Sequence, residues 1–560
     1  MIIFIYMFRK IYNNELLLSV LIFTLAFLFR IVFITKVPVS LNWDEASFGY
    51  NAYSILKTAR DEYGEFLPLQ FKSVGDYKAP LFIYALIPFI KIFGLNLFTI
   101  RLLPALTGSL SVVAFYFLTK FLVNKKTGLI AAIMLVVSPW HLQFTRAGAD
   151  VGFATFFTIL ALTSFLYGRN SRYFYYLSLV SFSLSVYSYF AERLFVPMIF
   201  VALIFVYKKQ IRKLNKRTFM NLLLILVLFI LPILLPLISG GHQEKIIKTT
   251  IFGFSRSQEY VLHVKSLSAS PLSYVLFHSE IIETTLGIAD RYLTHFSPRF
   301  LFLFGPSQDP RQFISYMGML YLVDALFVIV GLLSLSKLKA EHKNFIIIWL
   351  ILSPIPAAIT RDPVHARRAF NMVYPLMIFS AMGFWQIVAY LKNKHVFKRF
   401  FLSIIFLGTL VFSVTQYIFG YYFFSPEVNF KGPAGWQWGY KELVEEITPI
   451  AKNYDQVVVD TTYQGPYIFF LFYQKYSPGT YQLQAELVQE NKQTLGEGAK
   501  IDNIQFRPIY WPKDRYFSKT LFAGPPERVR LKDIDSQESR ILKEIYFPNG
   551  EIAWVLVEVF

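Results

Sequence analysis

The sequence predicts an all-α membrane domain of about 11 spans, followed by a C-terminal α/β domain outside the membrane. Three observations predict this architecture. The chain of 560 residues is 55% hydrophobic and only 16% charged, with a mean hydropathy of +0.45. Apolar runs that approach the roughly 20 residues of a spanning helix recur over residues 16–421. Beyond them, charges, turns and short alternating runs predict a different kind of domain.

The first predicted span is Leu16–Thr35, which follows Arg9 and Lys10. It is too long for the core of a signal peptide and has no small-residue cleavage site after it, so we interpret it as a retained span. The further predicted spans are Leu102–Val123, Gly128–Phe144, Val151–Tyr167, Tyr173–Phe190, Leu194–Tyr207, Phe219–Ile238, Ile314–Leu335, Phe345–Ile359, Ala369–Leu391 and Phe401–Tyr421.

Charge in the loops predicts the orientation. With the N-terminus in the cytoplasm, every cytoplasmic loop is basic and Glu341 is the single carboxylate among them, as the positive-inside rule requires. The opposite loops hold most of the carboxylates. The apolar segment Pro80–Phe93 is short and contains Pro88 and Lys91, and a span there would invert this bias. We therefore predict that it lies flat at the outer interface.

Two longer pieces lie outside the membrane in this topology, Ser239–Gln312 and the C-terminal domain. The sequence divides at residue 425, into a transmembrane domain of residues 1–424 and an extracytoplasmic α/β domain of residues 425–560. The elements predicted in the second are helices over Trp438–Lys452 and Pro466–Tyr476, a strand over Gln456–Asp460, and a hairpin formed by Ile541–Phe547 and Ile552–Phe560.

Composition also excludes several functions. The net charge is +19, from 55 Lys+Arg and 36 Asp+Glu, but the basic loops account for much of it without nucleic acid. The absence of cysteine excludes thiolate metal sites and cysteine nucleophiles. The eight histidines form no H-x-x-H or H-E-x-x-H motif, so no dedicated zinc site is predicted. No P-loop or G-x-G-x-x-G motif supports ATP-driven transport or nucleotide-sugar binding.

The first outer loop carries the residues of most chemical interest. Apolar residues at helical spacing predict a surface helix over Asp44–Arg60, with Asp44 and Glu45 at its N-terminus. One interpretation of such acids is an N-cap and a dipole partner, worth about 1 kcal/mol. They are also placed to act as a general base towards an amphipathic substrate. Lys78, in Asp76-Tyr77-Lys78, is either a snorkelling lysine or a cation for a lipid phosphate.

Arginines on the outer side run against the charge bias: Arg101, Arg146, Arg193, Arg361, Arg367 and Arg368. A charge in a span costs at least about 2.5–3.5 kcal/mol, so such residues usually pair or serve a site. Single cases can be local ion pairs, for example Arg146 with Asp150. Guanidinium groups bind phosphate in a bidentate manner, and the set as a whole predicts an outward cavity for an anionic headgroup.

The order of these motifs resembles that of a known family. A first span is followed by Asp44-Glu45, then by Asp76-Tyr77-Lys78-Ala79-Pro80, then by Gly94-Leu95-Asn96 and Arg101-Leu102-Leu103-Pro104. This order is similar to that of the C-type (GT-C) glycosyltransferases of the protein O-mannosyltransferase family 39, which use polyprenyl-phosphate sugars and include the lipid A aminoarabinose transferases. The latter have an arginine shortly after the acidic pair, where this chain has Ala46-Ser47-Phe48, and the mannosyltransferases have His-Pro-Pro where this chain has Lys78-Ala79-Pro80.

The resemblance implies an inverting hexosyl- or pentosyltransferase in the cell (inner) membrane. It implies that Asp44 and Glu45 are the catalytic pair, with Asp44 as the base and Glu45 orienting it or the acceptor, and it implies a phosphate-binding role for Lys78. The expected donor is a polyprenyl-phosphate sugar, the other partners are membrane lipids and an extracytoplasmic lipid, glycan or protein acceptor, and no nucleic acid is involved. The expected substrate-binding residues are Asp76, Lys78, Arg101, Arg146, Asp150, Arg193, Arg367 and Arg368.

Two alternatives stay open at this point. No cofactor is required for this chemistry, although Asp44, Glu45 and Asp150 could share a divalent cation. The rival function is a membrane lipid or sugar transporter, or flippase, that breaks no bond. Transporters often show repeats and charged midplane sites, whereas here no repeat is visible and the ionisable residues gather at the outer ends of the spans.

Overall fold

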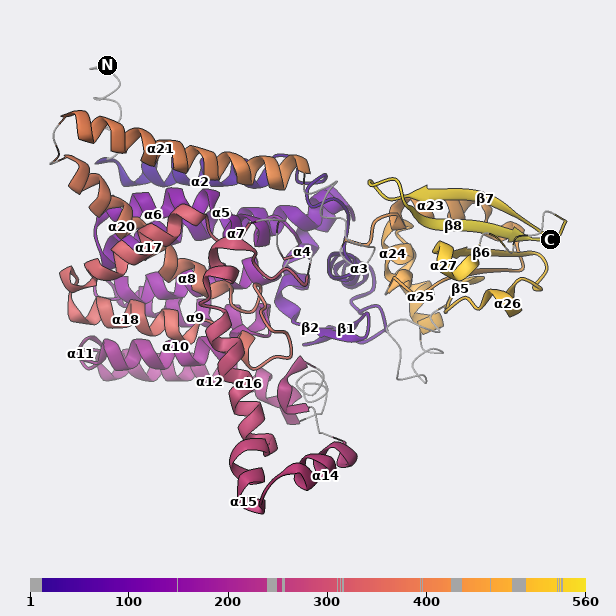
Figure 1. Ribbon diagram of the computed structural model, residues 1–560, viewed down its shortest axis with the longest axis horizontal. Helices are drawn as coiled ribbons and strands as arrows, with labels where there is room; N and C mark the ends of the chain where they lie inside the picture. The colour runs from indigo at the N-terminus through magenta and orange to yellow at the C-terminus, as the bar shows by residue number, and fades with distance from the viewer. Residues whose placement is uncertain are drawn as a thin grey trace.

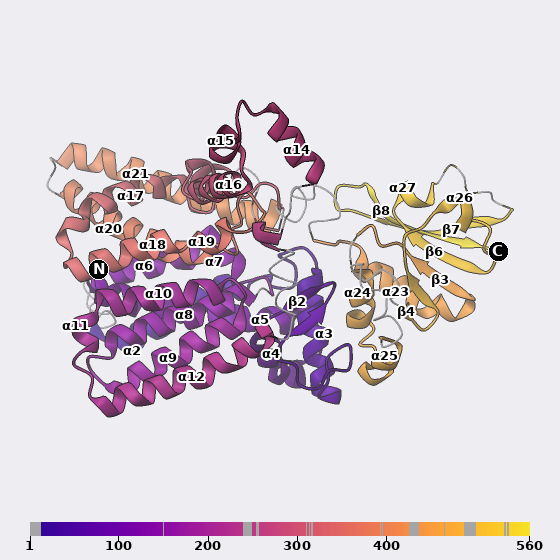
Figure 2. The ribbon, with the colours of Figure 1, turned by 90° about the horizontal axis from the view of Figure 1, so that it is seen from below.

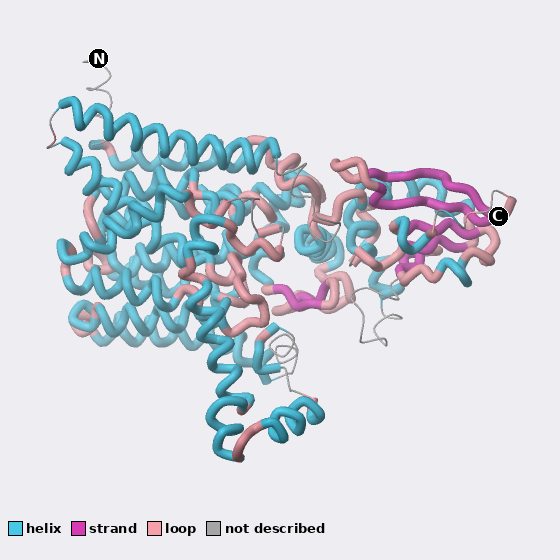
Figure 3. The backbone as a smooth tube through the Cα atoms, viewed as in Figure 1, coloured by secondary structure: helices cyan, strands magenta, loops and turns pink. Residues whose placement is uncertain are grey.

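In the computed structural model, the described residues are 13–560 except 149, 239–248, 254–256, 310, 313, 315–316, 393, 395, 425–435, 464, 486–499, 531, 533 and 535–536. The predicted domain boundary at residue 425 lies outside the described residues. The described part consists of a large helical bundle, a mixed segment after the first helix, and a C-terminal domain that contains most of the strands (Figures 1 and 3).

The membrane domain is a bundle of helices that run side by side along one direction (Figure 1). Its helices are α2 (Glu15–Ile31), α5 (Leu97–Leu122), α6 (Lys125–Val137), α7 (Pro139–Phe144), α8 (Asp150–Tyr167), α9 (Arg172–Ser188), α10 (Glu192–Val206), α11 (Lys208–Ile211), α12 (Lys216–Ile238), α17 (Leu322–Leu333), α18 (Ala340–Leu352), α19 (Ile355–Ala358), α20 (Val373–Lys392) and α21 (Val396–Phe419). A buried apolar core runs through it, with Trp140, Trp349 and Tyr374 among its largest members.

Four helical segments of the described chain are long and apolar enough to cross a membrane: 97–122, 150–167, 370–392 and 400–423. The count of about 11 spans is therefore not confirmed. One predicted span, Gly128–Phe144, is divided into α6 and α7, because Pro139 lacks the N–H that a continuous helix needs. Another, Ile314–Leu335, becomes helical only at Leu322.

The segment between α2 and α5 is built from α3 (Trp43–Thr58), β1 (Phe71–Ser73), β2 (Asp76–Lys78) and α4 (Pro80–Phe93). The helix predicted over Asp44–Arg60 is confirmed as α3, but most of its residues between Glu45 and Ile55 are buried, so the predicted surface position is not. Asn42 begins it, because its side chain accepts from the Glu45 backbone N–H at 3.0 Å while the Glu45 carboxylate accepts from the Asn42 N–H. The helix α4 is a separate element of 14 residues, shorter than a span.

The sequence did not predict the β1–β2 hairpin, which pairs Phe71 with Lys78 and Ser73 with Asp76. Its two-residue turn has φ of +49° at Val74 and +66° at Gly75, as in the left-handed turns that join short strands. A turn of this kind usually carries Asn-Gly or Asp-Gly. The Val-Gly pair found here is not a typical turn sequence, so the hairpin could not be recognised from it.

The C-terminal domain contains a six-stranded sheet of order β4-β5-β3-β6-β8-β7, in which β3 is parallel to β5 and β6. Its strands are β3 (Gln456–Val459), β4 (Lys500–Ile501), β5 (Ile504–Phe506), β6 (Thr520–Gly524), β7 (Ser539–Tyr546) and β8 (Ile552–Val559). Its helices are α23 (Tyr440–Ile450), α24 (Pro466–Tyr473), α25 (Pro478–Ala485), α26 (Trp511–Asp514) and α27 (Pro526–Val529). The two predicted helices, the strand and the β7–β8 hairpin are confirmed.

The C-terminal domain and the segment between α2 and α5 share one apolar core. Phe48 of α3 and Phe82 of α4 belong to the same buried cluster as Phe469 and Phe472 of α24. Both ribbon views show α3 between the bundle and the C-terminal domain (Figures 1 and 2). The remaining described helices, α14 (Gln258–Leu267), α15 (Pro271–Ser273) and α16 (Glu280–Thr294), project from the side of the bundle.

Candidate functional site

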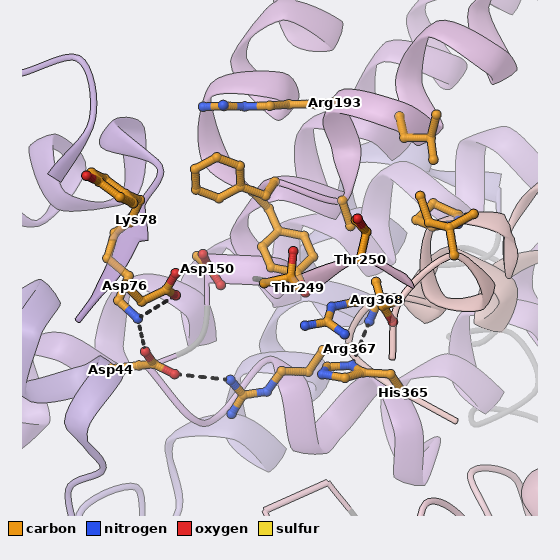
Figure 4. A pocket seen from close by; sticks show the side chains of 18 of the residues that line it. Asp44, Asp76, Lys78, Asp150, Arg193, Thr249, Thr250, His365, Arg367 and Arg368 are labelled. Atoms are coloured by element: carbon orange, nitrogen blue, oxygen red, sulfur yellow. Dashed lines mark hydrogen bonds and ion pairs between the residues drawn. The ribbon is translucent and has the colours of Figure 1, made fainter. Parts of the chain in front are cut away.

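A cavity of about 850 Å³ opens where the α2–α5 segment meets the bundle. It collects side chains from α3, β2, α8 and α10 and from the stretches before α17 and α20 (Figure 4). Seven of the ten predicted site residues line it: Asp44, Asp76, Lys78, Asp150, Arg193, Arg367 and Arg368. Segments more than 300 residues apart in the sequence therefore contribute to one site.

Asp44 is the centre of the charge network in this cavity. The Lys78 ammonium contacts one carboxylate oxygen of Asp44 and lies 3.5 Å from Asp76 Oδ2. Arg367 Nη1 lies 3.6 Å from the other oxygen of Asp44 (Figure 4). The side chains of Asp44 and Arg367 keep 19% and 13% of their surface exposed, so both groups can still be reached from the cavity.

The charges set the protonation states of these groups. Burial alone would raise the pKa of Asp44, but Lys78, Arg367 and Arg311 outweigh it and hold that pKa well below its ordinary value. Burial alone would lower the pKa of Lys78, yet Asp44, Asp76 and Asp150 raise it above its ordinary value. The carboxylate and the ammonium are thus both fully charged at neutral pH.

Arg311 and Asp309 also line the cavity, although neither was predicted as a site residue. Arg311 donates two hydrogen bonds of 3.0 and 3.1 Å to the Asp309 carboxylate. Its guanidinium carbon lies 4.9 Å from the centre of the Trp43 ring. Arg311 belongs to an extracytoplasmic stretch in the predicted topology. The criterion that selected the other outer arginines would therefore have found it.

Glu45 and Arg101 do not reach the cavity, although both were predicted as site residues. Arg101 uses all five N–H donors inside the protein, two on Glu45 at 2.7 and 3.0 Å and three on the carbonyls of Ile34, Pro38 and Ser40. Glu45 accepts from Arg101, from the Asn42 N–H and from the Gly148 N–H. Both side chains are fully buried, so this pair fastens α3 and the stretch between α2 and α3 to α5.

Gly148 shows how tightly this pair is enclosed. A Cβ added there would lie 2.8 Å from the Glu45 Cγ and 2.7 Å from Ile100. Only a glycine lets the backbone N–H approach the carboxylate to 2.7 Å.

Arg146 does not line the cavity either, and its role in the structure is to bind backbone carbonyls. Its guanidinium donates to the carbonyls of Phe29, Arg30, Val32 and Val37, which end the first helix. The side chain is fully buried. The predicted substrate contact of Arg146 therefore does not match its position.

The alternative of a shared divalent cation also meets a difficulty. The donors proposed for it were Asp44, Glu45 and Asp150, but the oxygens of Glu45 are already occupied by N–H groups. Among the described residues no three His, Asp or Glu side chains form a group that could hold a metal ion. Glu45 is therefore not available as a ligand for such a cation.

The cavity combines a charged floor with an apolar wall. Its described lining holds five cationic side chains and four carboxylates, a formal excess of one positive charge. Leu194, Leu234, Phe252, Pro356 and Ile359 are among the apolar side chains of the lining. Leu234 and Phe252 are themselves 46% and 66% exposed, so this wall continues onto the apolar outer surface of the bundle.

The hairpin that carries Asp76 and Lys78 rests on a second, buried polar cluster. Glu62 is fully buried and accepts hydrogen bonds from Tyr467 at 3.0 Å and from Asn51 at 3.2 Å. Burial, with a smaller contribution from Asp61, raises the pKa of Glu62 to about 8. The carboxyl group is therefore largely protonated at neutral pH.

This protonation predicts a pH dependence of stability. Between about pH 4.5 and 8 the folded protein keeps a proton on Glu62 that the unfolded chain releases. Stability then falls as pH rises through this window, by up to about 1.4 kcal/mol per pH unit. We expect Glu62→Gln to flatten the decline in melting temperature between pH 5 and 8 in detergent. Glu65→Gln, at a nearby exposed acid, is the control, and an unchanged slope in Glu62→Gln would contradict the assignment.

The chain is similar to several known proteins in sequence or in structure. Residues 77–235 match the family model described as dolichyl-phosphate-mannose-protein mannosyltransferase. The structure is similar to that of ArnT from Cupriavidus metallidurans bound to undecaprenyl phosphate, with a TM-score of 0.53 at 12% identity, over 96% of this chain and 97% of that one. A comparison with curated proteins gives no significant sequence match.

A second similar structure is the archaeal oligosaccharyltransferase AglB from Archaeoglobus fulgidus, in complex with an inhibitory peptide and a dolichol-phosphate. Its TM-score is 0.51 at 15% identity, over 83% of this chain and 64% of that one. The resemblance expected from the sequence is confirmed: the chain has the fold of the C-type glycosyltransferases, and its residues 77–235 match their mannosyltransferase family.

Proposed function

We propose that this protein is an inverting glycosyltransferase that moves a sugar from a polyprenyl-phosphate donor to an acceptor hydroxyl outside the cytoplasm. One observation carries the proposal. Asp44, Lys78 and Arg367 meet in one cavity whose lining combines charged side chains, with one more cation than carboxylates, and apolar side chains. A base, a phosphate-binding cation and a surface for a lipid tail are the parts that this reaction needs. The ligands named for ArnT and AglB, both polyprenyl phosphates, support the same donor class.

The charge of the cavity suits the change in charge of the donor. A sugar joined to a lipid phosphate is a phosphodiester with one negative charge, and the departing lipid phosphate gains a second. The excess of one positive charge matches the bound donor. Lys78 and Arg367 are placed to stabilise the charge that develops on the leaving oxygen.

In the ligand-free arrangement, Asp44 is a weak base, because Lys78 and Arg367 hold its pKa low. A bound phosphate competes with Asp44 for the same two cations. Their transfer to the phosphate would raise the basicity of Asp44 at the moment the donor is in place. The acceptor is then activated only beside a bound donor.

The chemical step is a displacement at the anomeric carbon. The acceptor O–H gives its proton to Asp44, and its oxygen forms a bond to the anomeric carbon. The bond from that carbon to the phosphate oxygen breaks, and its electron pair stays on the lipid phosphate. Since attack comes opposite the departing phosphate, the anomeric configuration inverts. Arg193 and Arg368, on other walls of the cavity, would hold the donor in place.

The proposed orientation follows the basic loops, with the N-terminus in the cytoplasm and the cavity and C-terminal domain outside. The cell (inner) membrane is the proposed location. The sugar, whether a hexose or a pentose, and the acceptor are open to direct screening.

The test is turnover by the purified protein. We expect detergent-purified protein, mixed with a panel of labelled undecaprenyl-phosphate hexoses and pentoses and a membrane extract as acceptor source, to release undecaprenyl phosphate. The label should pass to the acceptor. Movement of intact donor across reconstituted vesicles without bond cleavage would instead identify a transporter and overturn the proposal.

A further inference from the structure

We propose that the C-terminal domain positions the hairpin that bears Lys78, and that it does so through the hydroxyl group of Tyr467. This inference rests on the proposed function, and it deepens it. The C-terminal domain then contributes to binding of the lipid phosphate as a positioning element, although Tyr467 is not part of the cavity lining.

The hairpin needs support from outside itself. Its strands have three residues each, and an isolated hairpin is marginally stable even at greater length. Its turn also holds Val74, a β-branched residue, at a φ of +49°. Such a conformation is unfavourable for a β-branched residue and persists only where the surroundings enforce it.

The C-terminal domain supplies this support at the turn. The Val74 backbone N–H donates to the Tyr467 hydroxyl at 2.9 Å, and Tyr467 lies at the start of α24. The Val74 side chain is 4% exposed and packs against Gly465. A Cβ added at Gly465 would lie 2.6 Å from Val74 Cγ1, so the two surfaces are in direct contact.

The same hydroxyl also connects the hairpin to the helix of Asp44. It donates to Glu62 Oε1 at 3.0 Å, and Glu62 Oε2 accepts from Asn51 of α3 at 3.2 Å. One buried oxygen thus joins three segments: the hairpin with Lys78, α3 with Asp44, and α24. The contact between Lys78 and Asp44 depends on the relative placement of the first two.

The decisive variant is Tyr467→Phe, which removes the hydroxyl and keeps the ring. Tyr481→Phe is the matched control: its buried ring stacks on that of Tyr467 at 6.4 Å, and its hydroxyl makes no hydrogen bond to the hairpin in the described structure. Gly465→Ala displaces Val74 and, because Gly465 has a φ of +69° at the N-cap of α24, also strains the start of that helix; it tests the whole contact between α24 and the hairpin and should resemble Tyr467→Phe.

The first measurement needs no ligand. The chain has no cysteine, so Lys72→Cys, at an exposed position of β1, gives a single spin-label site on the hairpin. We expect the label to become more mobile in Tyr467→Phe and Gly465→Ala, and to stay unchanged in Tyr481→Phe. Equal mobility in wild type and Tyr467→Phe overturns the positioning role.

The second measurement is the affinity for undecaprenyl phosphate in detergent. We expect Tyr467→Phe to weaken it about tenfold, as the loss of one buried hydrogen bond would, and Tyr481→Phe to change it less than twofold. In a Lys78→Met background, Tyr467→Phe should cost nothing further, because it acts through Lys78. Independent, additive losses overturn the inference. A wild-type protein that binds no undecaprenyl phosphate overturns the proposed function instead, and the spin-label result still decides the positioning role.

Discussion

Asp44→Asn is expected to abolish sugar transfer and, at the same time, to tighten binding of the lipid phosphate. The amide cannot accept the acceptor proton, and loss of a general base typically lowers the rate by about 10²–10⁴-fold. The same change removes the anion that holds Lys78 and Arg367 in the ligand-free site. A phosphate then meets two cations with no internal competitor, and we expect its affinity to rise about fivefold.

The two effects have opposite signs, which makes the result diagnostic. A collapsed site would lose both turnover and binding. Turnover is measured with the undecaprenyl-phosphate sugar that the wild type uses, and binding with undecaprenyl phosphate alone. Asp455→Asn is the control, since that carboxylate is 69% exposed in the C-terminal domain and pairs with an exposed Lys519. Unchanged turnover in Asp44→Asn would show that another group is the base.

The positive-inside rule located three residues of the candidate site, for a physical reason. Cations on the outer side of a membrane protein are disfavoured unless they have a local purpose, and this selected Arg193, Arg367 and Arg368, which all line the cavity. The rule could not distinguish arginines that line a binding cavity from arginines that stabilise the fold. Arg101 and Arg146 meet the same criterion, yet they bind backbone carbonyls at the end of the first helix and in the stretch that follows it.

The sequence also could not divide the roles of two neighbouring acids. Successive residues on a helix point about 100° apart, so Asp44 faces the cavity while Glu45 faces the core. Which of the two faces inward depends on Arg101, 56 residues away. The hairpin at Val74 escaped prediction for a similar reason, because its turn is held by Tyr467 from the other domain and not by its own residues.

The buried pair leads to the second large effect: Arg101→Met is expected to destabilise the folded protein, rather than to alter catalysis selectively. The methionine has a similar length, but it leaves the Glu45 carboxylate buried without its partner and three carbonyls without donors. Breaking a buried pair in this way costs about 3–5 kcal/mol. Glu45→Gln should be damaging as well, because a neutral amide cannot satisfy the guanidinium.

The measurement is the fraction of monodisperse protein after heating in detergent, compared with that of Arg540→Met. Arg540 pairs with Glu558 at the surface and is 62% exposed, so its loss should cost at most about 1 kcal/mol. We expect Arg101→Met and Glu45→Gln to lose melting temperature, whereas Asp44→Asn keeps it. A stable Glu45→Gln protein that binds undecaprenyl phosphate but transfers no sugar would reverse this conclusion. That result would assign the catalytic role to Glu45. It would also mean that the ion pair with Arg101 is not the main role of Glu45.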